Sequence, residues 1–508
     1  MSSVDVAVFV GYLASVAAFG VWLGWRRRTA HEFMVAGGKL PGWAVGLSIF
    51  GTYVSSISFL ALPGKAYAAN WNPFVFSLSI PLTAWIAVRW FVPFYRKGGE
   101  VSAYAHLERR FGAWARTYAV ACYILSQLAR TGVILYLVAL ALSGLTGWRV
   151  ESLILVGSAG VIAYAFLGGM ESVIWTDAVQ SAILIGGALL CAGVLAAGTP
   201  GGPAAIFEIG SREGKFSLGS FGPGLSEATV WVVLLYGLSM NLQNFGIDQS
   251  FVQRYVTARS DLEAERSVWL GALLYLPISA AFLFIGTALY AHYATQPGRL
   301  PDGILPDKVF PHFIATALPA GAGGIVVAAL MAAAQSTVSS SVNCAATLVL
   351  CDLYRRHLRP AASDRESLLV LRLATAAFGG AGTAIALVLA ARAKESALDA
   401  WWALAGIASG GMLGLFLLGI LSRKATGRGA AFGVLFGVAA ISWMSLSPLV
   451  APSGAWWRSP LHTFLVTVVG TLAIFFAGLA ASWALGRRGW PRVPRGGRRG
   501  TATTSAPS

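Results

Sequence analysis

Long apolar segments, each about the length of a bilayer-spanning helix, recur along almost the whole chain. A helix that crosses the hydrocarbon core needs about 20 mostly apolar residues, because its backbone N–H and C=O groups must be paired within the membrane. Of the 508 residues, 56% are hydrophobic and only 11% are charged. This composition excludes an ordinary water-soluble domain and predicts an all-α polytopic membrane protein.

We expect thirteen transmembrane helices. They cover residues 4–25, 41–64, 73–95, 117–146, 150–168, 173–197, 229–247, 267–292, 320–350, 369–391, 398–421, 430–449 and 460–485. The first segment is interpreted as a mature helix, since it lacks both a preceding Lys or Arg and a small-residue cleavage site. Residues 486–508 form a basic tail that we expect to be disordered.

Basic residues are distributed unevenly between alternate loops. The loops after the first, third, seventh, ninth and eleventh predicted helices, together with the tail, hold 25 of the 37 lysines and arginines, Arg254 among them. Because Lys and Arg are enriched in cytoplasmic loops, the asymmetry predicts an N-terminus outside and a C-terminus in the cytoplasm. We therefore expect a multi-pass protein of the cell (inner) membrane. The net charge of +16 needs no nucleic-acid partner to explain it.

Two polar, glycine-containing stretches interrupt predicted helices. Residues 48–64 read SIFGTYVSSISFLALPG and predict a break in helix 41–64 that would expose the carbonyls of Gly51 and Val54. Residues 234–249 read LLYGLSMNLQNFGIDQ and suggest a second break, five helices later. This offset predicts an inverted repeat of five helices each, with a binding site between the broken helices. The alternative is that these small residues only allow close helix packing.

A third polar stretch lies in helix 320–350 and reads AAAQSTVSSSVNCAATL. Ala333, Ser336 and Thr337 share one helix face, and Ser339 and Ser340 belong to a neighbouring stripe. Neutral oxygens in this number suit a hard monovalent cation such as sodium. The alternative is that each hydroxyl bonds to its own helix backbone.

Two of the charged residues inside predicted helices are candidates for function. Arg130 lies near the middle of helix 117–146, too deep to reach the membrane surface easily. Its planar guanidinium suits a carboxylate, so it predicts recognition of an anion; the alternative is a structural brace. Asp177 lies about one turn inside helix 173–197 and is a candidate ion ligand, proton site or surface group.

At this point the sequence resembles the sodium:solute symporter family. The motifs that carry the resemblance are EFMVAGGKLPGW, ALPGKAYAANW, GGMESVIWTDAVQ, GIDQSFVQRYVTA and SSSVNCAATLVLCDLY, in this order and spacing. The family implies a LeuT-type 5+5 inverted-repeat core that works by alternating access. The expected division is 1–40, first helix and loop; 41–197, first repeat; 198–228, outer loop; 229–421, second repeat; 422–485, two peripheral helices; and 486–508, tail.

The resemblance also implies roles for individual residues. The main sodium site would use the carbonyls of Gly51, Val54 and Ala333 with the hydroxyls of Ser336 and Thr337, and a possible second site would use Asp177, Ser339 and Ser340. The substrate carboxylate would meet Arg130, with Ser55, Ser58, Tyr53, Ser77 and Asn241 nearby.

This reading makes the protein a secondary transporter that uses sodium as its coupling ion. The closest pattern within the family is that of the sodium/sialic acid transporters, so the expected solute is sialic acid or a related sugar acid. The alternatives are a monocarboxylate, pantothenate, proline, a polyol or a neutral sugar in the same fold. We expect no enzymatic activity, because the six histidines lack metal-site spacing and no phosphate-binding loop occurs. We expect the lipid bilayer, but no obligatory protein, as a partner.

Overall fold

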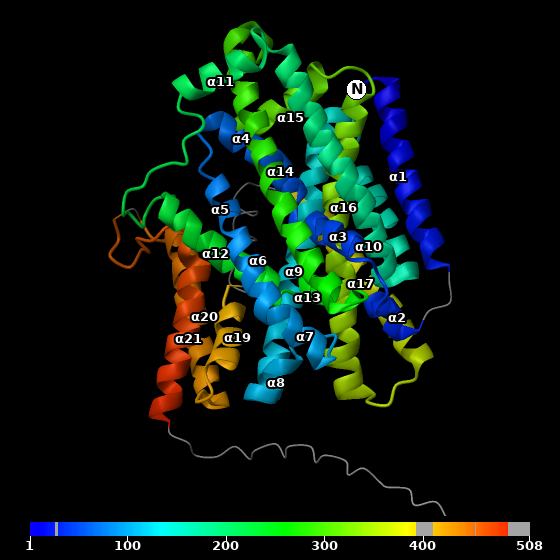
Figure 1. Ribbon diagram of the computed structural model, residues 1–508, viewed down its shortest axis with the longest axis vertical. Helices are drawn as coiled ribbons and strands as arrows, with labels where there is room; N and C mark the ends of the chain where they lie inside the picture. The colour runs from blue at the N-terminus through cyan, green and yellow to red at the C-terminus, as the bar shows by residue number, and fades with distance from the viewer. Residues whose placement is uncertain (26–28, 393–409, 453, 486–508) are drawn as a thin grey trace, which may run out of the picture.

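The computed structural model describes residues 1–25, 29–392, 410–452 and 454–485, and the regular structure in these ranges is helical (Figure 1). Ten of the described helices are long and apolar enough to cross a membrane, and a bent pair makes an eleventh span. The elements of the first part are α1 (Ser3–Gly24), α2 (Ala30–Val35), η1 (Ala36–Gly38), α3 (Gly42–Tyr53), α4 (Ser56–Ala68), α5 (Phe74–Leu78), α6 (Ile80–Ile86), η2 (Ala87–Phe91), α7 (Val92–Gly98), α8 (Ala105–Phe111), α9 (Ala113–Thr146), α10 (Val150–Gly198) and α11 (Gly202–Arg212).

The second part of the chain is also helical. Its elements are α12 (Val230–Ile247), α13 (Gln249–Thr257), α14 (Asp261–Thr295), η3 (Pro297–Arg299), α15 (Pro306–Thr316), α16 (Ala322–Leu348), η4 (Val349–Leu358), α17 (Asp364–Arg392), α19 (Met412–Leu421), α20 (Gly427–Val450) and α21 (Leu465–Ala484). In Figure 1, α11 and α15 lie at the end of the molecule where the chain begins, and α8 lies at the opposite end.

Helix α10 contains two predicted spans, residues 150–168 and 173–197. Its 49 residues would extend for about 70 Å at 1.5 Å per residue, more than twice the thickness of a hydrocarbon core. The two halves meet at Gly169, whose φ of 55° lies in the left-handed region. A side chain at Gly169 would collide with the Phe33 carbonyl, so glycine permits both the turn and the close approach.

The structure describes only the last part of the predicted helix 398–421. Residues 393–409 lie outside the described residues, and α19 corresponds to the last part of the predicted segment.

The second predicted break is present, but it lies at the end of the stretch 234–249 and not among its Gly, Ser and Asn residues. Helix α12 runs continuously from Val230 to Ile247, and the interruption falls at Asp248, where the backbone becomes extended before α13. The polar and small residues of α12 serve packing instead: a Cβ on Gly237 would lie 2.7 Å from the Ser79 hydroxyl. The close-packing alternative therefore describes this helix correctly.

Helix α16 is the central element of the fold. It packs against α1, α3, α9, α10 and α17. In the segment Ala322–Leu358, which contains α16, 94% of the most apolar 18-residue stretch is buried. Its many Ala, Gly and Ser residues allow neighbouring helices to approach closely. Helices α20 and α21 lie at one flank of the molecule, where α21 contacts α12 (Figure 1).

Candidate functional site

The break between α3 and α4 is made by two extended residues. Val54 has φ −78° and ψ 110°, and Ser55 has φ −94° and ψ 160°. The Ser55 hydroxyl accepts a hydrogen bond from the Ser58 backbone N–H at 3.3 Å and so caps the N-terminus of α4. The two helices meet at a bend of 55°. The predicted break in helix 41–64 is therefore confirmed.

The predicted first sodium ligands of α3 and α16 lie next to one another at this break. The Ser336 hydroxyl is 2.8 Å from the Gly51 carbonyl oxygen and 3.2 Å from the Ala333 carbonyl oxygen. The Thr337 hydroxyl is 3.1 Å from the same Ala333 oxygen. Val54, the remaining predicted ligand, is buried at the end of α3. This group offers neutral oxygens only, which suits a hard monovalent cation.

Glycine at position 51 permits a close approach of α3 to α10. A Cβ there would lie 2.6 Å from the Ser181 hydroxyl of α10, whereas its distance of 3.7 Å from the Ser336 Cβ of α16 is an ordinary contact. A larger residue would therefore displace the Ser181 hydroxyl or move α3 away from α10.

The residues of the predicted second ion site surround a buried arginine. Arg254 donates to Asp177 at 2.7 Å and to the Ser340 hydroxyl at 2.7 Å, and both charged side chains are fully buried. Ser48 donates to the same Asp177 oxygen at 2.7 Å and accepts from Arg254 at 2.8 Å. Ser339 contacts the other Asp177 oxygen at 3.3 Å.

Assigning Arg254 to a cytoplasmic loop was therefore wrong. Counting charges along the sequence places Arg254 in the loop after a membrane span. In the structure the backbone is extended at Asp248, and α13, which follows, packs against α3 and α16. The motif GIDQSFVQRYVTA contains both Asp248 and Arg254. The occurrence of these two charged residues in one motif is the sequence signal that could have indicated a buried arginine.

Four of the predicted substrate residues gather on the other side of the break. The Tyr53 hydroxyl donates to the Asn241 side-chain oxygen. Tyr53 also packs edge-on against Tyr275, with ring centroids 4.4 Å apart. Tyr275 in turn shares a cavity with Ser58 and Ser77.

Ser79 and Ser279, which the sequence analysis did not identify, complete this polar group. Ser79 accepts a hydrogen bond from the Asn241 amide nitrogen at 2.8 Å, and the Ser77 and Ser279 hydroxyls are 2.9 Å apart.

Arg130 lies on α9, which packs against α4. Within the described part of the chain, no carboxylate forms an ion pair with it. The residue is partly exposed.

A cavity of about 760 Å³ opens above this site, lined mainly by α4, α5, α12 and α14. Its lining includes Ser58, Ser77, Tyr275 and Ser279 and also the exposed residue Lys65. We call the end of the cavity at Lys65 its mouth. The cavity therefore connects the predicted substrate residues Ser58 and Ser77 with the protein surface at Lys65.

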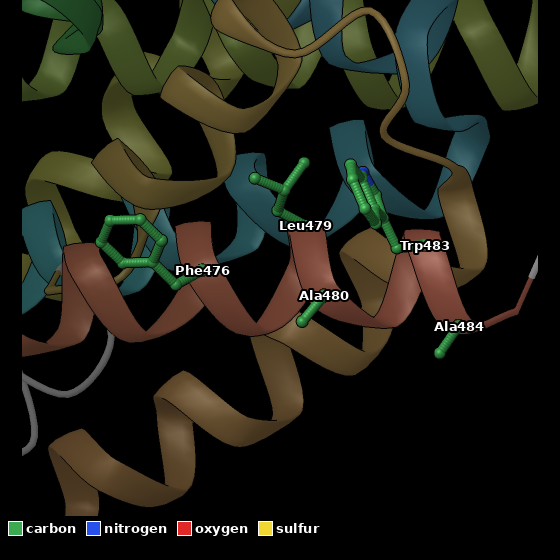
Figure 2. A pocket seen from close by; sticks show the side chains of 5 residues that line it. All are labelled: Phe476, Leu479, Ala480, Trp483 and Ala484. Carbon is green, nitrogen blue, oxygen red and sulfur yellow. The ribbon is translucent and has the colours of Figure 1, made fainter.

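A different hollow lies on the outer surface of α21 (Figure 2). It is lined by Phe476, Leu479, Ala480, Trp483 and Ala484, and Phe476 and Trp483 are largely exposed. An apolar surface of this kind on a membrane helix suits lipid chains rather than a polar solute.

At the opposite end of the molecule, ion pairs join α8, α9 and η4. Arg116 pairs with Asp352 and, at 3.0 Å, with Glu108. Arg356 also pairs with Glu108, at 2.7 Å. These contacts tie the elements together at the end remote from the cavity mouth.

Comparisons with known proteins show the family of the chain. The profile of the sodium:solute symporter family matches residues 33–437. The sodium/sialic acid symporter SiaT of Proteus mirabilis (strain HI4320) is 34% identical over 94% of both chains, and NanT of Aliivibrio fischeri (strain ATCC 700601 / ES114) is 32% identical over 93% of this chain and 91% of its own. A solved structure of a Na+-coupled sialic acid symporter, in a substrate-bound outward-open state, matches with a TM-score of 0.88 and 32% identity, covering 95% of this chain and 98% of that one.

The buried pair gives a stability prediction. Replacing Arg254 by Met leaves the Asp177 carboxylate buried without its charged partner, and we expect this to lower the free energy of unfolding by about 3 to 5 kcal/mol. The double variant Arg254→Met, Asp177→Asn should recover much of that loss, because no buried charge remains. Unfolding of the purified proteins in detergent measures both.

Arg149→Met is the matched control, because Arg149 pairs with Glu151 on the surface with both side chains exposed. That variant should change stability little. A double variant no more stable than Arg254→Met alone would contradict the charge argument.

Proposed function

Because the chain belongs to the sodium:solute symporter family, we propose that it imports a carboxylate-bearing solute, sialic acid or a related sugar acid, together with sodium by alternating access. The observation that carries the choice of solute is Arg130, which lies within the membrane span α9, packed against α4, and forms no ion pair with a described carboxylate. The similarity to two sodium/sialic acid symporters supports it.

The first sodium ion would be held by the carbonyls of Gly51, Val54 and Ala333 and the hydroxyls of Ser336 and Thr337. The short contacts from Ser336 to Gly51 and Ala333 support this assignment. An ion there would place positive charge between oxygens of α3 and oxygens of α16. It would therefore stabilise the contact between α3 and α16. Its binding would therefore favour the backbone conformation that presents α4 to the solute.

Arg254 would compete with a second sodium ion for the Asp177 carboxylate. Asp177, Ser339 and Ser340 suit a cation, but in the described arrangement the guanidinium already neutralises Asp177. We propose that these three residues bind a second ion only when Arg254 withdraws. Sodium coupling would then involve one permanently formed site and one conditional site.

The solute carboxylate would meet Arg130 near the N-terminus of α4. That helix end carries partial positive charge and directs unpaired N–H groups into the break. Ser55 already caps it, so we assign Ser55 a shared role: it shapes the helix end and offers its hydroxyl to the solute. Ser58, Ser77, Tyr53 and Asn241 would contact the remaining polar groups of a sugar acid.

The orientation follows from charge and shape together. The loops rich in Lys and Arg lie at the α8 end, which we assign to the cytoplasm. The cavity mouth then faces outside, as does the N-terminus, and the C-terminus lies inside. We infer that residues 41–197 and 229–421 are the two repeats that move relative to one another.

The first functional prediction concerns Ser336. Replacing it by Ala removes one neutral oxygen from the ion group, and a loss of about 1 kcal/mol corresponds to a roughly fivefold higher sodium concentration for half-maximal uptake. Uptake of N-acetylneuraminate into proteoliposomes at graded sodium concentrations measures the change.

Ser341→Ala is the control on the same helix, because the Ser341 hydroxyl donates to the Gln127 side chain and to the Thr337 carbonyl, and neither of these oxygens is a proposed sodium ligand. It should leave the sodium dependence unchanged. Uptake that proceeds equally without sodium would refute the assignment.

The second functional prediction concerns Arg130. Replacing it by Ala removes the partner of the solute carboxylate, and we expect roughly ten- to hundredfold weaker binding of N-acetylneuraminate. Arg130→Lys should recover only part of the affinity, because lysine keeps the charge but not the planar fork. Binding is compared for the acid and for an analogue whose carboxylate is reduced to an alcohol.

The wild type should prefer the acid strongly, and Arg130→Ala should nearly abolish that preference. Arg89→Ala, at an exposed arginine of η2, is the control and should retain it. If Arg130→Ala keeps the preference while remaining folded, the carboxylate is bound elsewhere.

A further inference from the structure

One face of α4 continues from the proposed solute site to the mouth of the cavity. Ser58, Ala61, Leu62 and Lys65 all line the cavity, and their spacing places them on a single helix face. Lys65 lies seven residues after Ser58, which is two turns or about 10 Å along the helix. The exposed ammonium group at the mouth is therefore separate from the groups around Ser58.

The wall opposite Lys65 is aromatic. Phe76 packs against Tyr236, with ring centroids 5.5 Å apart, and Tyr236 stacks on Phe464 at 4.7 Å and 11°. His462 packs against Phe464, and the Lys65 nitrogen lies 6.0 Å from the centre of the Phe464 ring. The mouth thus combines flat apolar surfaces with one flexible cation.

The charge at the mouth is positive. Among the described residues that line the cavity, none is Asp or Glu. Asp307 approaches α4 at Gly64, and no described acid forms an ion pair with Lys65. Burial, with the Lys65 charge beside it, lowers the pKa of His462 below its ordinary value, so His462 is neutral at pH 7 and Lys65 carries the charge.

We propose that the cavity mouth is an outer capture site, in which Lys65 attracts the carboxylate of an incoming organic anion before it reaches Arg130. The aromatic wall of Phe76, Tyr236 and Phe464 offers a surface to the apolar side of the solute. The inference rests on the proposed function, since it assumes that the transported solute is an anion.

A charge at the rim of a binding site acts on encounter more than on the final complex. It raises the local concentration of an oppositely charged ligand and the association rate, and the effect weakens as salt screens it. Lys65 should therefore lower the solute concentration needed for half-maximal uptake. It should leave the maximal rate unchanged, because the translocation step does not involve it.

The test compares Lys65→Gln with wild type in proteoliposomes, using N-acetylneuraminate at fixed sodium concentration. At low ionic strength we expect KM to rise about three- to tenfold, with kcat unchanged. Adding choline chloride should shrink the difference, since the Debye length falls to about 8 Å at 0.15 M salt. Lys65→Arg should resemble the wild type, and Lys65→Glu should raise KM further than Lys65→Gln.

Lys308→Gln is the matched control, because Lys308 is an exposed lysine on α15 that does not line the cavity. Equal KM values for Lys65→Gln, Lys308→Gln and wild type at every ionic strength would overturn the proposal. So would a fall in kcat with KM unchanged, which would assign Lys65 a structural role.

The proposal and the function on which it rests fail in different ways. If the wild type takes up N-acetylneuraminate and loses acid selectivity in Arg130→Ala, but Lys65→Gln has no effect, only the capture site is refuted. If the wild type takes up no organic anion, the proposed function fails and the capture site fails with it.

Discussion

The structure depends on one interruption of hydrogen bonding, at Val54 and Ser55 between α3 and α4. A continuous helix in a membrane pairs its own backbone groups, and a break leaves carbonyls at one end and N–H groups at the other without helical partners. The Gly51 carbonyl accepts a hydrogen bond from the Ser336 hydroxyl of α16, and Ser55 caps the N-terminus of α4. Ser336 is therefore the polar residue of α16 that the break explains, because its hydroxyl lies where the broken span contacts the central helix.

The same break has two electrically different ends. The C-terminal end of α3 presents carbonyl oxygens and favours a cation, whereas the N-terminal end of α4 presents N–H groups and favours an anion. A symporter of sodium and a carboxylate needs both within one site. The proposed sodium ligands lie at the first end, and α9, which carries Arg130, packs against α4. In the proposed function, binding of the ion and of the anion would therefore reinforce each other through the conformation of residues 54 and 55.

The sequence predicted the features that depend on local pattern. Apolar length located the spans, and the Gly and Ser content of residues 48–64 located the break, because both follow from backbone hydrogen bonding. The second break was placed wrongly, since Gly237 and Asn241 contact α5 and α6 in ways that only the tertiary structure defines. The assignment of Arg254 to a cytoplasmic loop was wrong for a similar reason. Its burial depends on how α13 packs after Asp248, and the distribution of charges along the sequence does not reveal this packing.

The central claim is that one conformation of the break serves both ligands, and thermodynamic linkage tests it directly. Calorimetric titration of the purified wild type with N-acetylneuraminate, repeated across sodium concentrations and followed by sodium titrations with and without the solute, measures the coupling in both directions. The account predicts that sodium raises the solute affinity and that the solute raises the sodium affinity by the same factor. A solute affinity that is independent of sodium would contradict it.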